Sequence, residues 1–199
     1  MKNKTLLVSG LLVLFALGSL QAGDYKIDSS HTGVGFKVKH LAIANVNGNF
    51  KEFSGKFGFD EKTNALTGLD VTIKASSINT NDSDRDAHLK KGDFFDVDKY
   101  PELTFKVANA DIKKGGVSKV KGDLTIKGVT KPVVLNVKFL GSAKDPWGNQ
   151  KLAFEAETKI KRTDFGLTWN KTLETGGVLV GEEVTIQIEG QAVPAAPAK

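Results

Sequence analysis

Apolar and polar residues alternate along most of the chain, and this period of two restricts the fold more than any other feature. In one run Val34, Phe36 and Val38 alternate with Lys37 and Lys39. Successive side chains of a β-strand point to opposite faces, so such a run predicts a strand with one buried and one solvated face. The same pattern recurs over residues 71–76, 119–127, 133–139, 152–161 and 184–188.

Turn-forming residues separate these runs. They lie at Asn47-Gly48 and at residues 114–116, 145–149 and 175–177. Between Phe50 and Phe53 the alternation slips by one residue, which predicts a β-bulge. Short strands joined by hairpin turns favour an antiparallel barrel or sandwich. Because no internal repeat is evident, we expect one domain.

One segment, residues 78–105, departs from the alternation. Residues 81–83 (Asn-Asp-Ser) are helix N-cap types, Asp86 and Lys90 are spaced for an i,i+4 ion pair, and Gly92 is a typical helix stop. The sequence therefore predicts one short helix inserted into an otherwise all-β domain.

The N-terminal residues 1–22 have the composition of a signal peptide. Lys2 and Lys4 form a basic start, residues 6–17 are mostly apolar, and Ala22 offers a small residue for cleavage. The apolar run is shorter than the ~20 residues of a membrane span. We expect cleavage near Ala22 and export to the periplasm, leaving a domain of residues 23–193 and a disordered Pro/Ala tail, residues 194–199.

The composition excludes several classes of function. The chain has 199 residues, no cysteine and a formal net charge of +5 at pH 7. It can form no disulfide or thiolate metal site, and its three histidines include no His-x-His pair. Its basic residues are mostly scattered lysines, whereas nucleic-acid surfaces favour clustered arginine. No nucleophile elbow, phosphate loop or dinucleotide fingerprint is present, so we predict no metal, cofactor, nucleic acid or catalytic residue.

Several motifs, in this order, resemble one family. They are residues 31–32, 34–41 and 53–60, then Arg85-Asp86-Ala87-His88-Leu89, Phe94-Phe95 and Tyr100-Pro101, then residues 122–132 and 162–167. Together they resemble the YceI-like, polyisoprenoid-binding family over most of residues 24–193. The resemblance implies a secreted, lipocalin-like antiparallel β-barrel of about eight strands that holds a long apolar chain.

The phenylalanine and small residues on the inner faces bear on whether the barrel interior is a packed core or a cavity. Ordinary core packing accounts for the rings, but Ala75, Ser77, Gly122, Ala156 and Thr158 sit where a filled core would take larger groups, which favours a cavity. The predicted lining residues are Phe36, Val38, His40, Phe50, Phe53, Ile73, Ala75, Phe94, Phe95, Phe105, Leu124, Ile126, Leu135, Phe154 and Ala156.

We expect His31, Arg85, His88 and Arg162 at a polar mouth of the barrel. Arg85 and Arg162 are the two arginines among 28 basic residues. In a chain that otherwise uses lysine, this indicates positions that need a planar guanidinium group able to donate several hydrogen bonds. Clamping of the helix to the barrel is the first interpretation of the arginines, and contact with a ligand head group is the second. For each histidine taken singly, a hydrogen-bonded structural role is the first interpretation, and a polar contact at the mouth is the second.

The ligand that the resemblance implies is a long-chain isoprenoid or a similar fatty amphiphile. We expect a periplasmic carrier without stable membrane insertion, and leave a homodimer open. We also expect the inserted helix to cover one mouth, with Phe94 and Phe95 fixing it there. The alternatives are an enzyme that acts on such a lipid through His40 or His88, and a stress-response or assembly protein whose barrel is filled.

Overall fold

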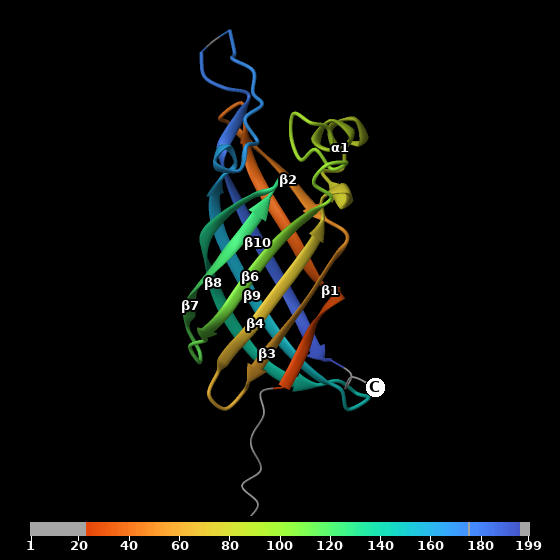
Figure 1. Cartoon of the computed structure of the whole chain (residues 1–199), viewed down its shortest axis with the longest axis vertical. Helices are drawn as coiled ribbons and strands as arrows, with labels where there is room; N and C mark the ends of the chain where they lie inside the picture. The colour runs from red at the N-terminus through yellow and green to blue at the C-terminus, as the bar shows by residue number, and fades with distance from the viewer. Residues whose placement is uncertain (1–22, 175, 196–199) are drawn as a thin grey trace, which may run out of the picture.

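The computed structural model describes residues 23–174 and 176–195 (Figure 1). The ten strands found in these ranges are β1 (Gly23–His40), β2 (Ala44–Phe50), β3 (Phe53–Asp60), β4 (Ala65–Lys74), β5 (Ile78–Asn79), β6 (Glu102–Asp111), β7 (Val117–Ile126), β8 (Val129–Lys144), β9 (Gln150–Lys161) and β10 (Val180–Pro194). The helical elements are α1 (Ser83–Leu89) and the 3₁₀ turns η1 (Ala75–Ser77) and η2 (Arg162–Phe165).

Eight of these strands close into an antiparallel barrel, as the family resemblance implies. They follow the order β10-β9-β8-β7-β6-β4-β3-β1, and β10 pairs with β1 to complete the ring. The break at Lys51–Glu52, where the alternation slips, separates β2 from β3. As a result β1 pairs with β3 through its first four residues and with β2 through Val34–His40.

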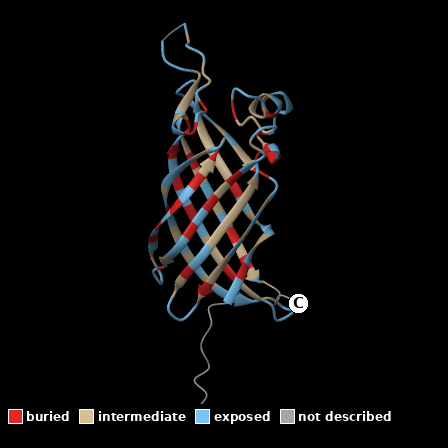
Figure 2. Ribbon diagram, in the orientation of Figure 1, coloured by how far each residue is buried: buried red, intermediate tan, exposed pale blue. Residues whose placement is uncertain are grey.

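The alternation in the sequence becomes an alternation of burial in the walls. Along β7, Ser118, Val120, Gly122, Leu124 and Ile126 are buried, and the lysines between them are exposed. Figure 2 shows the same alternation on neighbouring strands. The core therefore lies inside the ring, and none of the helices in the described part of the chain is long and apolar enough to cross a bilayer.

The inserted helix is shorter than predicted. Asp82 caps it by accepting a hydrogen bond from the Arg85 N–H (3.0 Å), and it ends at Leu89 rather than at Gly92. The predicted Asp86–Lys90 pair is wrong because the Asp86 carboxylate is buried and accepts from the N–H (2.8 Å) and hydroxyl (2.6 Å) of Thr80. Turns then carry the chain to Tyr100 and β6.

The predicted turn at Asn47-Gly48 is also wrong. Both residues lie inside β2, and the chain reverses at residues 41–43 instead. Gly48 is needed for packing: a Cβ there would lie 2.4 Å from the Phe36 ring, which crosses directly over it. The turns at residues 114–116 and 145–149 lie between strands as predicted.

The ends of the chain are only partly described. The predicted signal peptide, residues 1–22, and residues 196–199 lie outside the described ranges, so the leader and most of the tail stay predictions. β10 reaches Pro194, and the Ala195 N–H donates to the Asp24 carbonyl (2.7 Å). The ordered domain thus extends beyond Val193.

The Phe36–Gly48 contact gives a stability prediction. Gly48→Ala should lower the free energy of unfolding by about 1–3 kcal/mol, because the new methyl must displace the Phe36 ring. Gly33→Ala is the matched control, since a Cβ there meets nothing within 4 Å, and should change stability by less than about 0.5 kcal/mol. Urea unfolding of both variants measures the difference; equal stabilities would contradict the packing role of Gly48.

Candidate functional site

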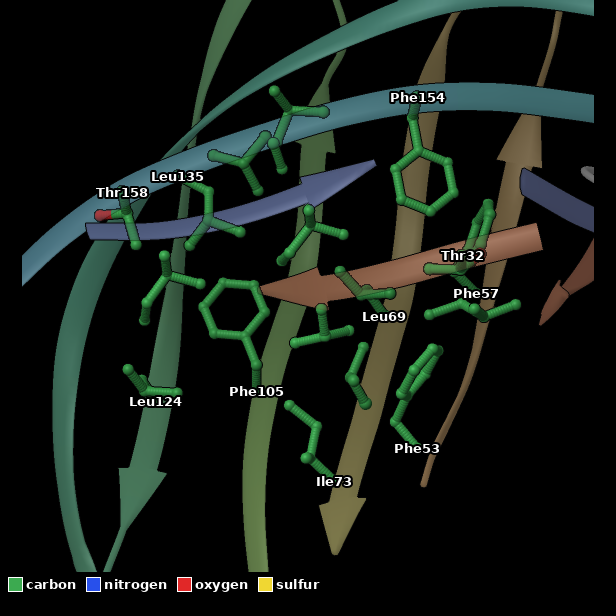
Figure 3. Close-up of a pocket in the computed structure, with 18 of the residues that line it drawn as sticks. Thr32, Phe53, Phe57, Leu69, Ile73, Phe105, Leu124, Leu135, Phe154 and Thr158 are labelled. Atoms are coloured by element: carbon green, nitrogen blue, oxygen red, sulfur yellow. The ribbon is translucent and has the colours of Figure 1, made fainter. Parts of the chain in front are cut away.

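The barrel encloses a cavity of about 190 Å³ (Figure 3). Its wall is built from the inward faces of the barrel strands, with eight phenylalanine rings among the lining residues. These rings are Phe36, Phe50, Phe53, Phe57, Phe59, Phe105, Phe139 and Phe154. The rest of the described lining is aliphatic apart from Gly35 and two threonines, so no ionisable side chain faces the space.

The two lining threonines also present carbon to the cavity, because their hydroxyls are bound to the wall. The Thr158 hydroxyl donates to the Val134 carbonyl (2.8 Å), and its oxygen points away from the rings in Figure 3. The Thr32 hydroxyl donates to the Gln191 carbonyl (3.2 Å) and accepts from the Gln191 N–H (3.1 Å). A cavity of this kind offers water no partners and favours apolar groups.

The small residues predicted to open the cavity do so only in part. Ala156 and Thr158 line it. Ala75 and Ser77 lie in the 3₁₀ turn η1, buried but away from the cavity. Gly122 leaves no empty space, because the Phe105 ring fills the position where its Cβ would be (2.5 Å).

Ten of the predicted lining residues do line the cavity. They are Phe36, Phe50, Phe53, Ile73, Phe105, Leu124, Ile126, Leu135, Phe154 and Ala156. Their contact with a ligand stays a prediction.

Five predicted lining residues lie elsewhere. Val38 and His40 continue the inner face of β1 beyond the cavity, and Ala75 is in η1. Phe94 packs against His88 and Trp169, with ring centroids 5.1 and 5.2 Å away. Phe95 meets the edge of Phe50 (5.8 Å), so it touches the wall rather than the space.

Several lining residues were missed although the alternation contains them. Phe57 and Phe59 lie on the same face as Phe53, and Val137 and Phe139 on the same face as Leu135. Ile186 and Ile188 follow in the same way. The alternation does not reveal Ile27, Leu69 and Ile112 as lining residues. The strand register shifts near the first two, and β6 ends just before Ile112.

Comparison with known proteins agrees with this geometry. The model of the YceI-like domain matches residues 25–192. The chain belongs to the YceI-like family.

Individual relatives cover almost the whole chain. It is 42% identical over 193 residues to protein YceI of Shigella flexneri. The match covers 96% of this chain and 98% of the relative. The crystal structure of the Campylobacter jejuni YceI protein has 40% identity and a TM-score of 0.67, covering 85% of this chain and 97% of that one. A polyisoprenoid binding domain from Saccharophagus degradans shares the fold at 16% identity, with a TM-score of 0.63 and coverage of 86% and 98%.

In this YceI-like domain Arg162 is a structural clamp. Its guanidinium is buried and donates to four backbone carbonyls, those of Leu167, Trp169, Val180 and Gly181. Burial lowers the pKa of Arg162, and the charge of Glu182 partly offsets this. The guanidinium therefore ties η2 and the segment after it to the start of β10, rather than the helix to the barrel.

Arg85 fastens the start of α1 instead. Its Nε donates to the Thr80 hydroxyl and its Nη2 to the Thr80 carbonyl, both at 2.8 Å. His88 follows on the same helix, wedged edge-on between Phe94 and Trp169, with its Nε2 3.4 Å from the Asp93 carboxylate. These contacts account for both side chains without a ligand.

His31 lies apart from the other three residues of the predicted mouth, beside the β8–β9 hairpin. Its Nδ1 is 3.0 Å from both the Asp28 carboxylate and the Ser30 hydroxyl. A catalytic serine must meet the other ring nitrogen, so this Ser-His-Asp group lacks triad geometry. Hydrogen bonds from Ser30, Lys151 and His31 hold the pKa of Asp28 far below its usual range, although partial burial acts in the opposite direction.

The described residues contain no group of three His, Asp or Glu side chains that could hold a metal ion. The candidate site is therefore the cavity itself. What its described lining offers a ligand is a shape and an apolar surface.

The role of Arg162 is testable. Arg162→Lys should lower the free energy of unfolding by about 2–4 kcal/mol, because one ammonium cannot serve all four carbonyls and an unpaired buried carbonyl costs about 1–3 kcal/mol. Lys161→Met, one residue away and exposed, should stay within about 0.5 kcal/mol. Denaturant unfolding measures both; a stable Arg162→Lys protein with altered lipid affinity would instead favour a head-group role.

Proposed function

We propose that the barrel binds the apolar tail of an amphiphilic lipid and carries it in the periplasm. The observation that supports this is the carbon-lined cavity, in which both hydroxyls are bound to the wall. A long-chain isoprenoid is the first candidate, because the structural neighbour from Saccharophagus degradans is described as polyisoprenoid binding. The leader-like residues 1–22 support export.

Affinity would come mainly from the tail. Each Å² of apolar surface removed from water contributes about 25 cal/mol, offset by the cost of ordering a flexible chain. A charged or hydroxylated head group would find no hydrogen-bond partner inside the cavity. It would therefore remain outside and set orientation rather than affinity.

The size of the cavity limits how a long tail can enter. A dry apolar cavity of about 150 Å³ is known to hold a benzene molecule, so 190 Å³ accommodates only a short stretch of chain. A longer tail would have to displace side chains. Phenylalanine rings make up much of the lining, and rotation about their side-chain bonds could lengthen the space.

We propose binding without catalysis. His40 and His88, the candidate acid–base groups for lipid chemistry, are absent from the cavity lining. A lipid held in the cavity would meet no titratable side chain there. Native mass spectrometry of the protein from its own periplasm would identify the ligand, and an unmodified lipid would support a carrier.

Ala156→Trp should reduce uptake of labelled farnesol at least about tenfold, because the indole would occupy the cavity. Ala153→Trp is the matched control: it lies on the same strand, on the outward face, and should bind normally. Circular dichroism establishes that both proteins are folded. Normal uptake by a folded Ala156→Trp protein would contradict the proposal; if that variant unfolds, Ala156→Leu provides the same test with a smaller group.

The two rings after the helix should have separate roles. Phe94→Ala should cost about 3–5 kcal/mol of stability through lost packing on His88 and Trp169. Phe95→Ala should mainly speed the release of lipid, because it removes support from Phe50 in the cavity wall. Stopped-flow release and urea unfolding distinguish them. Equal stability losses with wild-type release rates would show that the segment does not cover the cavity.

A further inference from the structure

Two loops at the helix end of the barrel expose apolar side chains side by side. Ile43 in the β1–β2 turn is 82% exposed, with Leu41 at 38%, and Val178 in the loop before β10 is at 46%. The Leu41 N–H donates to the Leu179 carbonyl (2.9 Å), which joins the two loops. Both lie at the top of Figure 1, at the same end as α1. We call Leu41, Ile43 and Val178 the apolar tip.

The backbone of the turn makes this exposure unusual. Leu41 and Ala42 have φ values of 53° and 61°. Glycine or asparagine adopts this left-handed conformation at lower cost than leucine or alanine. A strained turn that displays apolar groups to solvent is typical of a functional position rather than of a neutral loop.

Strand register links the tip to the cavity through successive rows of the inner face. Phe36, which lines the cavity, pairs with Gly48 on β2 and Ile186 on β10. The next row outward contains Val38, Val46 and Val184, all half-buried. The row after it contains His40, Ala44 and Val180, and the tip follows. An apolar chain could thus run from cavity to tip along mostly aliphatic side chains.

The charges beside the tip favour an anionic partner. Lys39 precedes the turn, and Lys171 accepts the Leu179 N–H at its carbonyl (2.9 Å). Both lysines are exposed, and neither takes part in an ion pair found in the described ranges. Exposed acidic residues are also near: Glu174 in the same loop, and Glu182 beside Gly181, which lies against Lys39. The positive charge is therefore confined to the two lysines that flank the tip. Exposed apolar groups flanked by lysine are the combination that binds anionic lipid surfaces.

We propose that the apolar tip inserts shallowly into an anionic bilayer surface. This would bring the row of Val38, Val46 and Val184 close to the lipids. This rests on the proposed lipid-binding function, because the bilayer would be where the bound tail is exchanged. A second copy of the chain is a poorer occupant. Stable protein interfaces bury about 1,200–2,000 Å² in total, which three side chains on two loops cannot supply.

Vesicle flotation tests the proposal with the mature full-length protein. Vesicles of phosphatidylcholine with added phosphatidylglycerol should bind the wild type, and binding should weaken at high salt. The double variant Leu41→Asn, Ile43→Asn should bind at least about fivefold less. Asparagine tolerates the left-handed backbone at position 41, so the turn is retained. Val117→Asn, which replaces a 52% exposed valine at the opposite end of the barrel, should bind like the wild type.

Three outcomes would overturn the proposal: no binding by the wild type, equal binding by the double variant, or a dimer in size-exclusion chromatography that the double variant abolishes. Uptake of farnesol from solution, without vesicles, separates this proposal from the lipid-binding function. Wild-type uptake by the double variant with reduced vesicle binding supports docking. Wild-type uptake with unchanged vesicle binding removes docking alone, and no uptake by the wild-type protein removes the lipid-binding function.

Discussion

The pairing of β1 with β10 is the contact on which the rest of the structure depends. It runs from Tyr25 opposite Pro194 to His40 opposite Val180, and it joins the two ends of an otherwise open sheet. Once the ring is closed, β1 and β10 are no longer the free edges of the eight-stranded order, open to pair with another chain. The backbone N–H and C=O groups of the wall can then pair between neighbouring strands. The interior can therefore be lined by apolar side chains.

Contacts between rings and glycines set how much of that interior stays empty. Phe36 lies across Gly48 and Phe105 across Gly122, so each glycine lets a ring approach the wall. A larger residue at either position would push the ring toward the centre. The free volume therefore depends on the orientation of a few rings, and these can move more readily than the strands that carry them.

Much of the fold followed from the sequence because a period of two in hydrophobicity has one simple structural meaning. The alternation around Phe36, Leu124, Leu135 and Phe154 predicted both strands and inward faces. Closure of the ring could not be predicted in this way, since no local pattern pairs residue 25 with residue 194. The Asn47-Gly48 turn failed for a similar reason: Gly48 serves a ring twelve residues earlier, and the reversal uses Leu41 and Ala42 in a conformation their side chains disfavour.

Within the site, the sequence predicted which side chains point into the barrel better than how far along the barrel the cavity extends. Val38 and His40 have the same orientation as Phe36, yet the cavity ends before them, because depth depends on how far neighbouring strands extend. The arginines show the complementary limit. Their rarity indicated a need for a planar guanidinium group, but not that most of its acceptors would be backbone carbonyls.

The apolar interior also limits how a bound tail could leave. A tail released into water would lose its burial energy at about 25 cal/mol for each Å² exposed, so spontaneous release becomes slower as the tail lengthens. Release into an environment of equal apolarity avoids that cost. Of the two ends, the one with α1 has the half-buried valines Val38, Val46 and Val184 leading outward. Toward the other end the tilted rings of Phe59 and Phe139 pack against each other in the cavity lining, with centroids 5.2 Å apart. For the carrier proposed above, the tail would leave fastest where the valine-lined end meets an apolar acceptor.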